Sequence, residues 1–396
     1  MKKLLATAAV CGLVMAAAPA NAEVDLGIGG FFKGYGVFVD QDEDAGSTAA
    51  TTGDARDFDM IRHTEVHFSG ETTLDNGLTV GMHIETEADG DDAFDVEESY
   101  AYFSGGWGRV NAGAEDGAQY LLQVEAPSAD SNVDGLRQYV QPVNYNVATN
   151  TAAAGSLTAG VTANGIDYEA NATGYADKLT YLSPVFSGFQ LGLSYTPDTA
   201  NNGGDANDLE GVRNNDVNNA FGAAYEGGVR YEGQMDNVGI TLGAGYTHID
   251  LEQNTNTASN PSDDRTVWNV GADLNIGPVG LGVSYSEDDY GDVRNAGNTA
   301  DKDSEDTLVV GVDYTVGAFK LGASYMNQDG TLNVTGNTGN DGVETDRYTG
   351  GVVYTYGPGM TFRGSVSYIE HDNVSGLTSG DSIDATSVLL GTQINF

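Results

Sequence analysis

The sequence predicts an all-β fold, a transmembrane antiparallel β-barrel of 16 strands with short turns at one end and long loops at the other. Three observations lead to this prediction. Apolar and polar residues alternate in short segments, as expected for strands with one face in lipid. Gly, Pro and Asn turn signals join these segments in pairs, and acidic loops separate the pairs. After the N-terminal region, no stretch approaches the 18 apolar residues of a membrane-spanning helix.

The first 22 residues have the features of a secretory signal peptide. Lys2 and Lys3 precede the apolar run LLATAAVCGLVMAAA, and the A-x-A motif Ala20-Asn21-Ala22 follows. Cleavage after Ala22 is expected to leave residues 23–396 as one barrel domain. Cys11 lies in the signal peptide, so the mature chain is expected to use neither disulfides nor thiolate chemistry.

The composition excludes several classes of function. The chain has 58 acidic and 16 basic residues and a formal net charge of −42, so it is expected to repel nucleic acid. Its 55 glycines and 21 tyrosines, with only eight prolines, favour a β-rich protein over a disordered one. It contains no G-x-S-x-G, GxxxxGK[ST] or HExxH motif, and we therefore predict that it is not an enzyme.

The first strands show the alternation clearly. From residue 24 to residue 38, apolar side chains of one parity alternate with a polar face that includes Lys33. An acidic loop, 40–56, leads to a hairpin of 58–70 and 78–87 that turns at Asp75-Asn76-Gly77. The polar face of this hairpin carries three histidines and two glutamates. We interpret that cluster as a polar patch of the wall and predict no dedicated metal site; its members are His63, Glu65, His67, His83 and Glu85.

The same hairpin unit recurs to the C-terminus. Further short turns are predicted at Gly105-Gly106, Ser183 to Gly188, Asp236-Asn237, Gly277-Pro278, Val316-Gly317 and Gly357-Pro358. With eight longer loops between the hairpins, this gives 16 strands; if residues 146–174 paired as one more hairpin, the number would be 18. Tyrosines recur at strand ends, where a barrel places its interfacial girdles. They are Tyr195, Tyr246, Tyr285, Tyr325, Tyr354 and Tyr368.

The connection 115–175 is far longer than ordinary loops, which indicates a functional role. It follows directly on the strand segment that contains Arg109. We predict that this third loop folds into the barrel and narrows a pore, and that its acidic residues line the constriction. The candidates are Glu115, Asp116, Glu125, Asp130 and Asp134.

Basic residues are scarce and fall on the polar parity of their strands. A charge on the lipid face costs about 2–4 kcal/mol at mid-depth, so these side chains are expected in the lumen. There they would oppose the acidic loop and set up a field across the aperture. The predicted basic wall consists of Lys33, Arg109, Lys178 and Arg230. Lys320 and Arg363 lie beside short turns and are expected to neutralise neighbouring carboxylates. Arg62 has the opposite parity, which indicates either contact with a neighbouring subunit or a β-bulge.

Several segments resemble the general diffusion porins of Gram-negative outer membranes, in particular the sixteen-stranded trimeric porins of proteobacteria. The resemblance implies a homotrimer with short periplasmic turns, long extracellular loops and a third loop folded inward as an eyelet. The chain departs from the family pattern in an Ala/Thr/Gly/Asn-rich insertion at about 146–174. The segments that carry the resemblance are FSGETTLDNGLTVGMHIETE (68–87), ESYAYFSGGWGRVNAG (98–113), DKLTYLSPVFSGFQLGLSYTPD (177–198) and the terminal Phe396.

The predicted function is a water-filled outer-membrane channel for passive diffusion of ions and small hydrophilic solutes. The protein is expected to reach the outer membrane after secretion through the inner membrane. The acidic excess predicts cation selectivity. Two alternatives remain open: a substrate-selective channel with a site in the third loop, or a mainly structural or adhesive surface barrel. No cofactor is expected. Divalent cations such as Ca²⁺ would bind diffusely to the acidic loops and bridge them to lipopolysaccharide.

Overall fold

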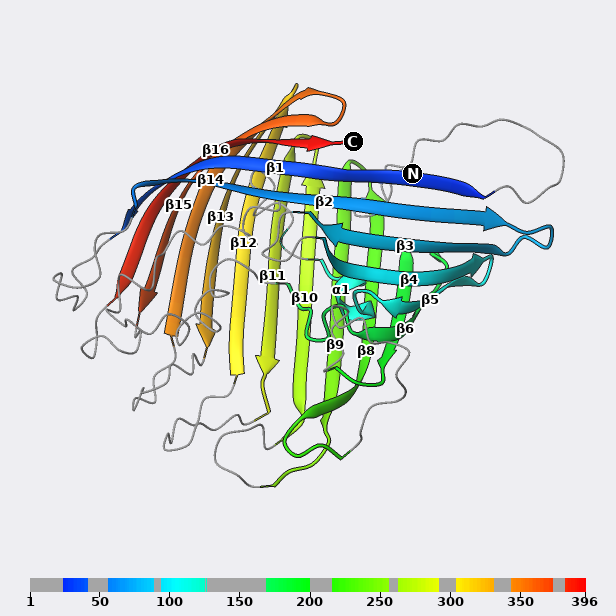
Figure 1. The fold of residues 1–396 in the computed structure, drawn as a ribbon. Coiled ribbons are helices and arrows are strands. Elements are labelled where there is room, and N and C mark those ends of the chain that lie inside the picture. Colours follow the sequence, from blue (N-terminus) through cyan, green and yellow to red (C-terminus); the bar gives the residue numbers. More distant parts are fainter. Residues whose placement is uncertain are drawn as a thin grey trace.

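The computed structural model describes residues 24–41, 56–88, 94–124, 126, 169–199, 216–255, 263–291, 304–330, 343–372 and 382–396. These residues form a closed barrel of antiparallel strands in chain order, β1 to β16, which confirms the predicted 16-stranded fold (Figure 1). The proposed signal peptide lies outside the described residues. The strands are β1 Asp25–Gln41, β2 Phe58–Thr73, β3 Thr79–Glu87, β4 Asp95–Gly105, β5 Gly108–Ala114, β6 Asp177–Leu182, β7 Phe189–Thr196, β8 Phe221–Met235, β9 Val238–Leu251, β10 Arg265–Ile276, β11 Val279–Asp289, β12 Ser304–Val316, β13 Phe319–Gly330, β14 Val343–Gly357, β15 Met360–Asp372 and β16 Ile383–Asn395.

The barrel closes where the two terminal strands meet. β1 pairs with β16 from Phe31 opposite Asn395 to Gln41 opposite Ala385. The backbone of Phe396 completes this seam, because its N–H and C=O both bond to Gly30 at 3.1 Å. No strand edge of the sheet is left open, as a barrel in lipid requires.

The outer surface is apolar and the inner one polar, because successive side chains of a strand point to opposite faces. Exposed Leu191, Leu193 and Leu242 lie on the outer face, whereas Ser194 and Thr247 are buried on the inner one. Aromatic pairs lie near both strand ends, for example Phe319 with Tyr354 at 4.8 Å and Tyr325 with Tyr348 at 4.9 Å between ring centroids. Within the described ranges, no helix is long and apolar enough to cross a membrane.

Arg62 is exposed on the outer face, next to the exposed Met60. The register between β1 and β2 runs without a shift from Asp25 opposite Glu71 to Phe38 opposite Phe58. The bulge that would have turned Arg62 inward is therefore absent from this pairing, and contact with a neighbouring subunit stays a prediction.

The third loop does not add strands to the barrel. β5 pairs directly with β6, from Arg109 opposite Leu182 to Ala114 opposite Asp177. The 18-stranded alternative is therefore wrong, although residues 127–168 themselves lie outside the described part. One element was not predicted from the sequence: the short helix α1 (Ala118–Leu122), which contacts the strands β6 to β9 (Figure 1).

Candidate functional site

Helix α1 lies against a patch of lumen wall that is made of glycines. These glycines are neighbours across the sheet, with Gly192, Gly228 and Gly245 in one row and Gly243 beside Gly271 in the next. A Cβ on Gly228 would overlap the carbonyl oxygen of Ala118, and one on Gly271 would overlap that of Val124. The missing side chains create a groove across β7 to β10 that accepts the helix and the residues after it.

Polar contacts fix the helix in this groove. The N–H of Ala118 donates to Oγ of Ser194 at 2.8 Å. Gln119 is almost completely buried; its Nε2 donates to Oδ1 of Asn269 at 3.0 Å, and its Oε1 accepts from the hydroxyl of Thr247. The N–H of Gln119 donates to Oε2 of Glu226 at 3.4 Å. The helix is thus bonded to four consecutive strands, β7 to β10.

Glu115 and Asp116 lie at the root of the loop, and they are buried. Their exposed fractions are 2% and 7%, and that of the nearby Lys178 is 4%. Asn111 donates to Oε2 of Glu115 at 2.6 Å, and Asn171 donates to Oδ1 of Asp116 at 2.8 Å. The Lys178 ammonium donates to the carbonyl oxygens of Glu115 and Gly174, so it joins the start of the loop to its end.

Burial sets the protonation of these two acids. It raises the pKa of Glu115 to about 7, against the opposing effect of the hydrogen bond from Asn111. Burial likewise raises the pKa of Asp116 to about 7, against the hydrogen bond from Asn171 and the charge of Lys178. Near neutral pH both carboxyls are therefore partly protonated, unlike acids in open water.

This placement differs from the predicted one. Glu115 and Asp116 were expected to line the aperture, but the structure buries both between the loop and the wall. The reason is that the loop turns along the wall immediately after β5, so its first residues are buried and form hydrogen bonds that hold the loop to the wall. Glu125, Asp130 and Asp134 lie outside the described residues, and their role at the aperture stays a prediction.

The predicted basic wall is only partly brought together. Lys178 is buried beneath the loop. Arg230 donates from Nη1 to the carbonyl oxygen of Gln123 and from Nε to Glu232, both at 2.8 Å. Arg109 donates to Oδ1 of Asn111 at 2.6 Å and stacks over the ring of Tyr102 at 3.9 Å. These three residues hold or flank the loop.

Two other predicted basic residues lie apart from the loop. Lys33, on β1, has its ammonium 4.2 Å from the ring centroid of Phe31. Lys320 forms an ion pair of 3.0 Å with Asp313, as expected for a group that neutralises a nearby carboxylate.

The loop continues along the wall beyond the helix. Buried Ala126 packs with Val309 of β12 and Met326 of β13. On the returning segment, the N–H of Ala170 donates to Oε1 of Gln123 at 3.0 Å, and the hydroxyl of Thr173 donates to Glu226. The described residues of the third loop therefore contact the inner wall from β5 as far as β13.

The chain matches the sequence model of the Gram-negative porins over residues 6–374. It belongs to the Gram-negative porin family. Family and barrel together place it in the outer membrane, and porins are channels rather than enzymes. Uncharacterized proteins of Rickettsia felis and Rickettsia conorii are 29% and 28% identical over 126 residues, which are 31% of this porin and 27% of each relative's length.

Solved porin structures share its fold. The anion-selective porin of Comamonas acidovorans is 18% identical and superposes with a TM-score of 0.59, over 94% of this chain and 100% of that one. The trimer form of OmpT from Vibrio cholerae is 14% identical, with a TM-score of 0.56 over 95% and 100% of the two chains. A triple mutant of the Rhodopseudomonas blastica porin is 17% identical, with a TM-score of 0.53 over 94% and 100%.

Several residues of the site could not be predicted from the sequence. Gln119, Gln123 and Glu226 are polar residues without a motif, and nothing in the sequence singles them out. Arg265 begins β10 and pairs with Asp288 at 2.5 Å, but it was assigned to a loop. The glycine patch did leave a signal, since glycine takes the lumen-facing positions of four consecutive strands.

Proposed function

We propose that this porin is a passive channel for ions and small hydrophilic solutes, and that it prefers cations. The observation that carries the proposal is the third loop bonded to the inner wall of a closed barrel. A loop whose described residues are held to the wall by Lys178, Arg230 and the glycine groove is expected to narrow the lumen. Porins of known structure with the same fold support the passive mechanism.

Charge supports the preference for cations. Acidic residues outnumber basic ones 58 to 16. On β2 to β4 the inner wall carries partly exposed glutamates such as Glu85 and Glu98. The basic side chains Lys178 and Arg230, by contrast, donate to backbone carbonyls of the loop. An excess of acidic side chains over basic ones along the lumen concentrates mobile cations. The Comamonas porin is anion-selective, but at 18% identity the likeness extends to the fold alone.

Reversal potentials in planar bilayers test the proposal. Under a KCl gradient across a single purified channel, we expect the sign that indicates K⁺ permeation. Glu85→Gln removes one lumen carboxylate and should weaken the selectivity. Glu344→Gln is the matched control, because it removes the same charge from the exposed outer side of β14.

Three results would contradict parts of this proposal. A reversal potential that indicates Cl⁻ would refute cation selectivity. Block of the current by a solute at micromolar concentration would indicate a substrate-selective channel. A folded barrel that does not conduct would indicate a structural or adhesive protein.

We further propose that the porin assembles as a homotrimer and reaches the outer membrane by signal-peptide-directed secretion. The trimer form of the Vibrio cholerae OmpT, which shares the fold, supports the first point. The apolar run after Lys2 and Lys3, which is typical of a signal peptide, supports the proposed secretion. Chemical cross-linking of the protein in detergent should give a ladder that ends at three chains.

A further inference from the structure

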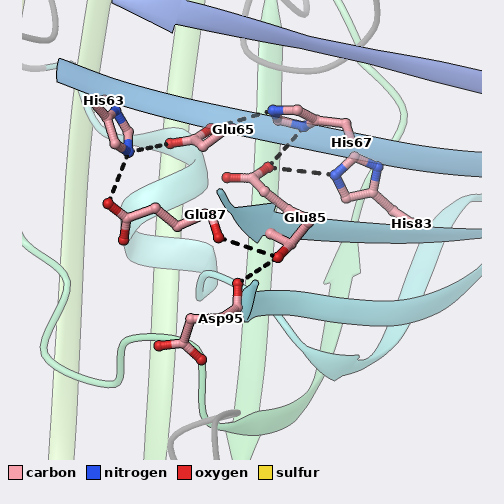
Figure 2. A network of polar contacts seen from close by, with 8 residues as sticks. His63, Glu65, His67, His83, Glu85, Glu87 and Asp95 are labelled. Atoms are coloured by element: carbon pink, nitrogen blue, oxygen red, sulfur yellow. Dashed lines mark hydrogen bonds and ion pairs between the residues drawn. The ribbon is translucent and has the colours of Figure 1, made fainter. Parts of the chain in front are cut away.

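Three histidines and several glutamates form a network on the inner wall of β2, β3 and β4 (Figure 2). Nδ1 of His67 lies 3.0 Å, and Nε2 of His83 lies 3.5 Å, from the same oxygen Oε2 of Glu85. One donor atom from each of the three residues lies within 4.8 Å of the other two. We propose that His67, His83 and Glu85 bind a divalent transition-metal ion of the Zn²⁺ type in the lumen.

The spacing is close to what such an ion needs. Zn²⁺ binds nitrogen and oxygen ligands at about 2.0–2.2 Å in a tetrahedron, so neighbouring donor atoms lie roughly 3.4 Å apart. The two separations at Glu85 already bracket that value. The donor nitrogens of the two imidazoles lie within 4.8 Å of each other. Both side chains are partly exposed, at 24% and 15%, so an ion can reach them from the lumen.

The surroundings of His67 match the second shell of a metal-binding histidine. Such a histidine binds the ion through one nitrogen and donates the N–H of the other to a carboxylate. Here Nε2 of His67 lies 3.2 Å from Oε2 of Glu65, while Nδ1 points to Glu85 (Figure 2). Glu65 is itself held by Nε2 of His63 at 3.1 Å. Phe31 packs against both histidines of β2, with ring centroids 5.2 and 6.3 Å away.

A β-bulge places another carboxylate beside the site. Glu85 pairs with Glu98, but the next residue, Thr86, pairs with Val96, so Glu97 is the extra residue of β4. A bulge changes the direction of a side chain, and bulges are frequent beside functional sites. A carboxylate oxygen of Glu97 lies within 4.8 Å of oxygens of Glu65 and Glu85. Glu97 therefore lies beside Glu85 at the edge of the proposed site, and the fourth position is left to water.

The donor set favours Zn²⁺ over Ca²⁺ or Mg²⁺. Imidazole suits transition metals, whereas the hard cations take oxygen ligands. The described residues contain a second group, His248 with Asp250 and Asp264, but it has one imidazole and its carboxylates are exposed. It provides a histidine of similar local chemistry for comparison.

Calorimetric titration of the folded, EDTA-treated protein with ZnCl₂ tests the proposal without any need for conduction. We expect one Zn²⁺ per chain, bound also in excess CaCl₂. His67→Gln and His83→Gln should each weaken the affinity by at least about tenfold, since loss of a mere second-shell partner already costs 10- to 100-fold. Glu65→Gln should fall within that range, and His248→Gln should bind as the wild type does.

Three results would overturn the assignment. The wild-type protein could bind no Zn²⁺, Ca²⁺ at equal concentration could displace it, or His248→Gln could lose as much affinity as His67→Gln. The second result would mean diffuse binding to carboxylates, and the third would place the ion at the other histidine. Each variant is first checked for a folded barrel by its heat-dependent migration in detergent gels.

Discussion

Gly271→Ala perturbs the contact between the third loop and the wall most directly. A Cβ at this position would overlap the carbonyl oxygen of Val124 and lie 3.1 Å from its Cβ. A backbone carbonyl cannot rotate away as a side chain can, so the segment must lift off the wall. Overpacking of this kind costs about 1–3 kcal/mol. The adjacent carbonyl of Gln123 accepts from Arg230 at 2.8 Å, and the same shift strains that bond.

Amide hydrogen exchange measures this cost locally. The N–H of Leu121 bonds to the carbonyl of Gly117 at 2.9 Å, and that of Gln123 bonds to Tyr120 at 3.2 Å. If the helix is held by the groove, a penalty of about 1–3 kcal/mol should speed exchange at these amides by roughly 5- to 150-fold. The single-channel conductance should change as well, while the exchange of the barrel strands should not.

Gly239→Ala is the matched control. Gly239 faces the lumen from β9, but a Cβ there would meet only Asn275, with its nearest atom at an ordinary 3.4 Å. The amide exchange at Leu121 and Gln123 and the conductance of the Gly239→Ala variant should equal those of the wild type. The reasoning would be refuted if Gly271→Ala also left the exchange at Leu121 and Gln123 and the conductance unchanged.

Two further predictions concern the root of the loop. Burial raises the pKa of both Glu115 and Asp116 to about 7, so protonation of these carboxyls stabilises the docked loop, that is, the third loop bonded to the inner wall. Their contribution is complete below the ordinary pKa values, 4.5 for Glu115 and 3.8 for Asp116, and it is lost as the pH rises to about 7; the two pKa shifts correspond to at most roughly 3 kcal/mol for Glu115 and roughly 4 kcal/mol for Asp116. Amide exchange of the loop, corrected for its intrinsic pH dependence, should show this decline, and Glu115→Gln with Asp116→Asn should remove it. Lys178→Met leaves the carbonyl oxygens of Glu115 and Gly174 without their donor, and it should destabilise the docked loop by about 1–3 kcal/mol. Limited proteolysis would then cut the third loop sooner, and an unchanged cleavage rate would contradict the role of Lys178.

The barrel could be predicted because its determinants are local. Alternation with period two identifies a strand, and turns such as Asp75-Asn76-Gly77 and Gly277-Pro278 identify a hairpin within a few residues. The boundaries were harder where acidic residues continue a strand beyond the membrane. Arg265 and Ser304, for example, begin β10 and β12 within stretches that were expected to be loops.

The docking of the loop could not be predicted in the same way, because its contacts join distant parts of the chain. Gln119 bonds to Asn269, 150 residues away, and to Thr247, 128 residues away. Alternation placed Lys178 and Arg230 on the correct face of their strands, but it could not tell which would be covered by the loop. Burial of Glu115 and Asp116 depends on that covering, and so does their changed protonation.

The division of charge in the lumen differs from the simple opposition of an acidic loop and a basic wall. Lys178 and Arg230 of the wall donate to loop carbonyls, and Glu226 of the wall accepts from the loop, so these charged groups hold the loop. Arg230 also forms an ion pair with Glu232 at 2.8 Å. Glu115 and Asp116 are partly protonated near neutral pH. The partly exposed Glu85 of β3 therefore contributes to the charge that mobile ions meet on the described wall. Substitutions there should change ion selectivity, whereas substitutions at the root of the loop should change the shape of the pore.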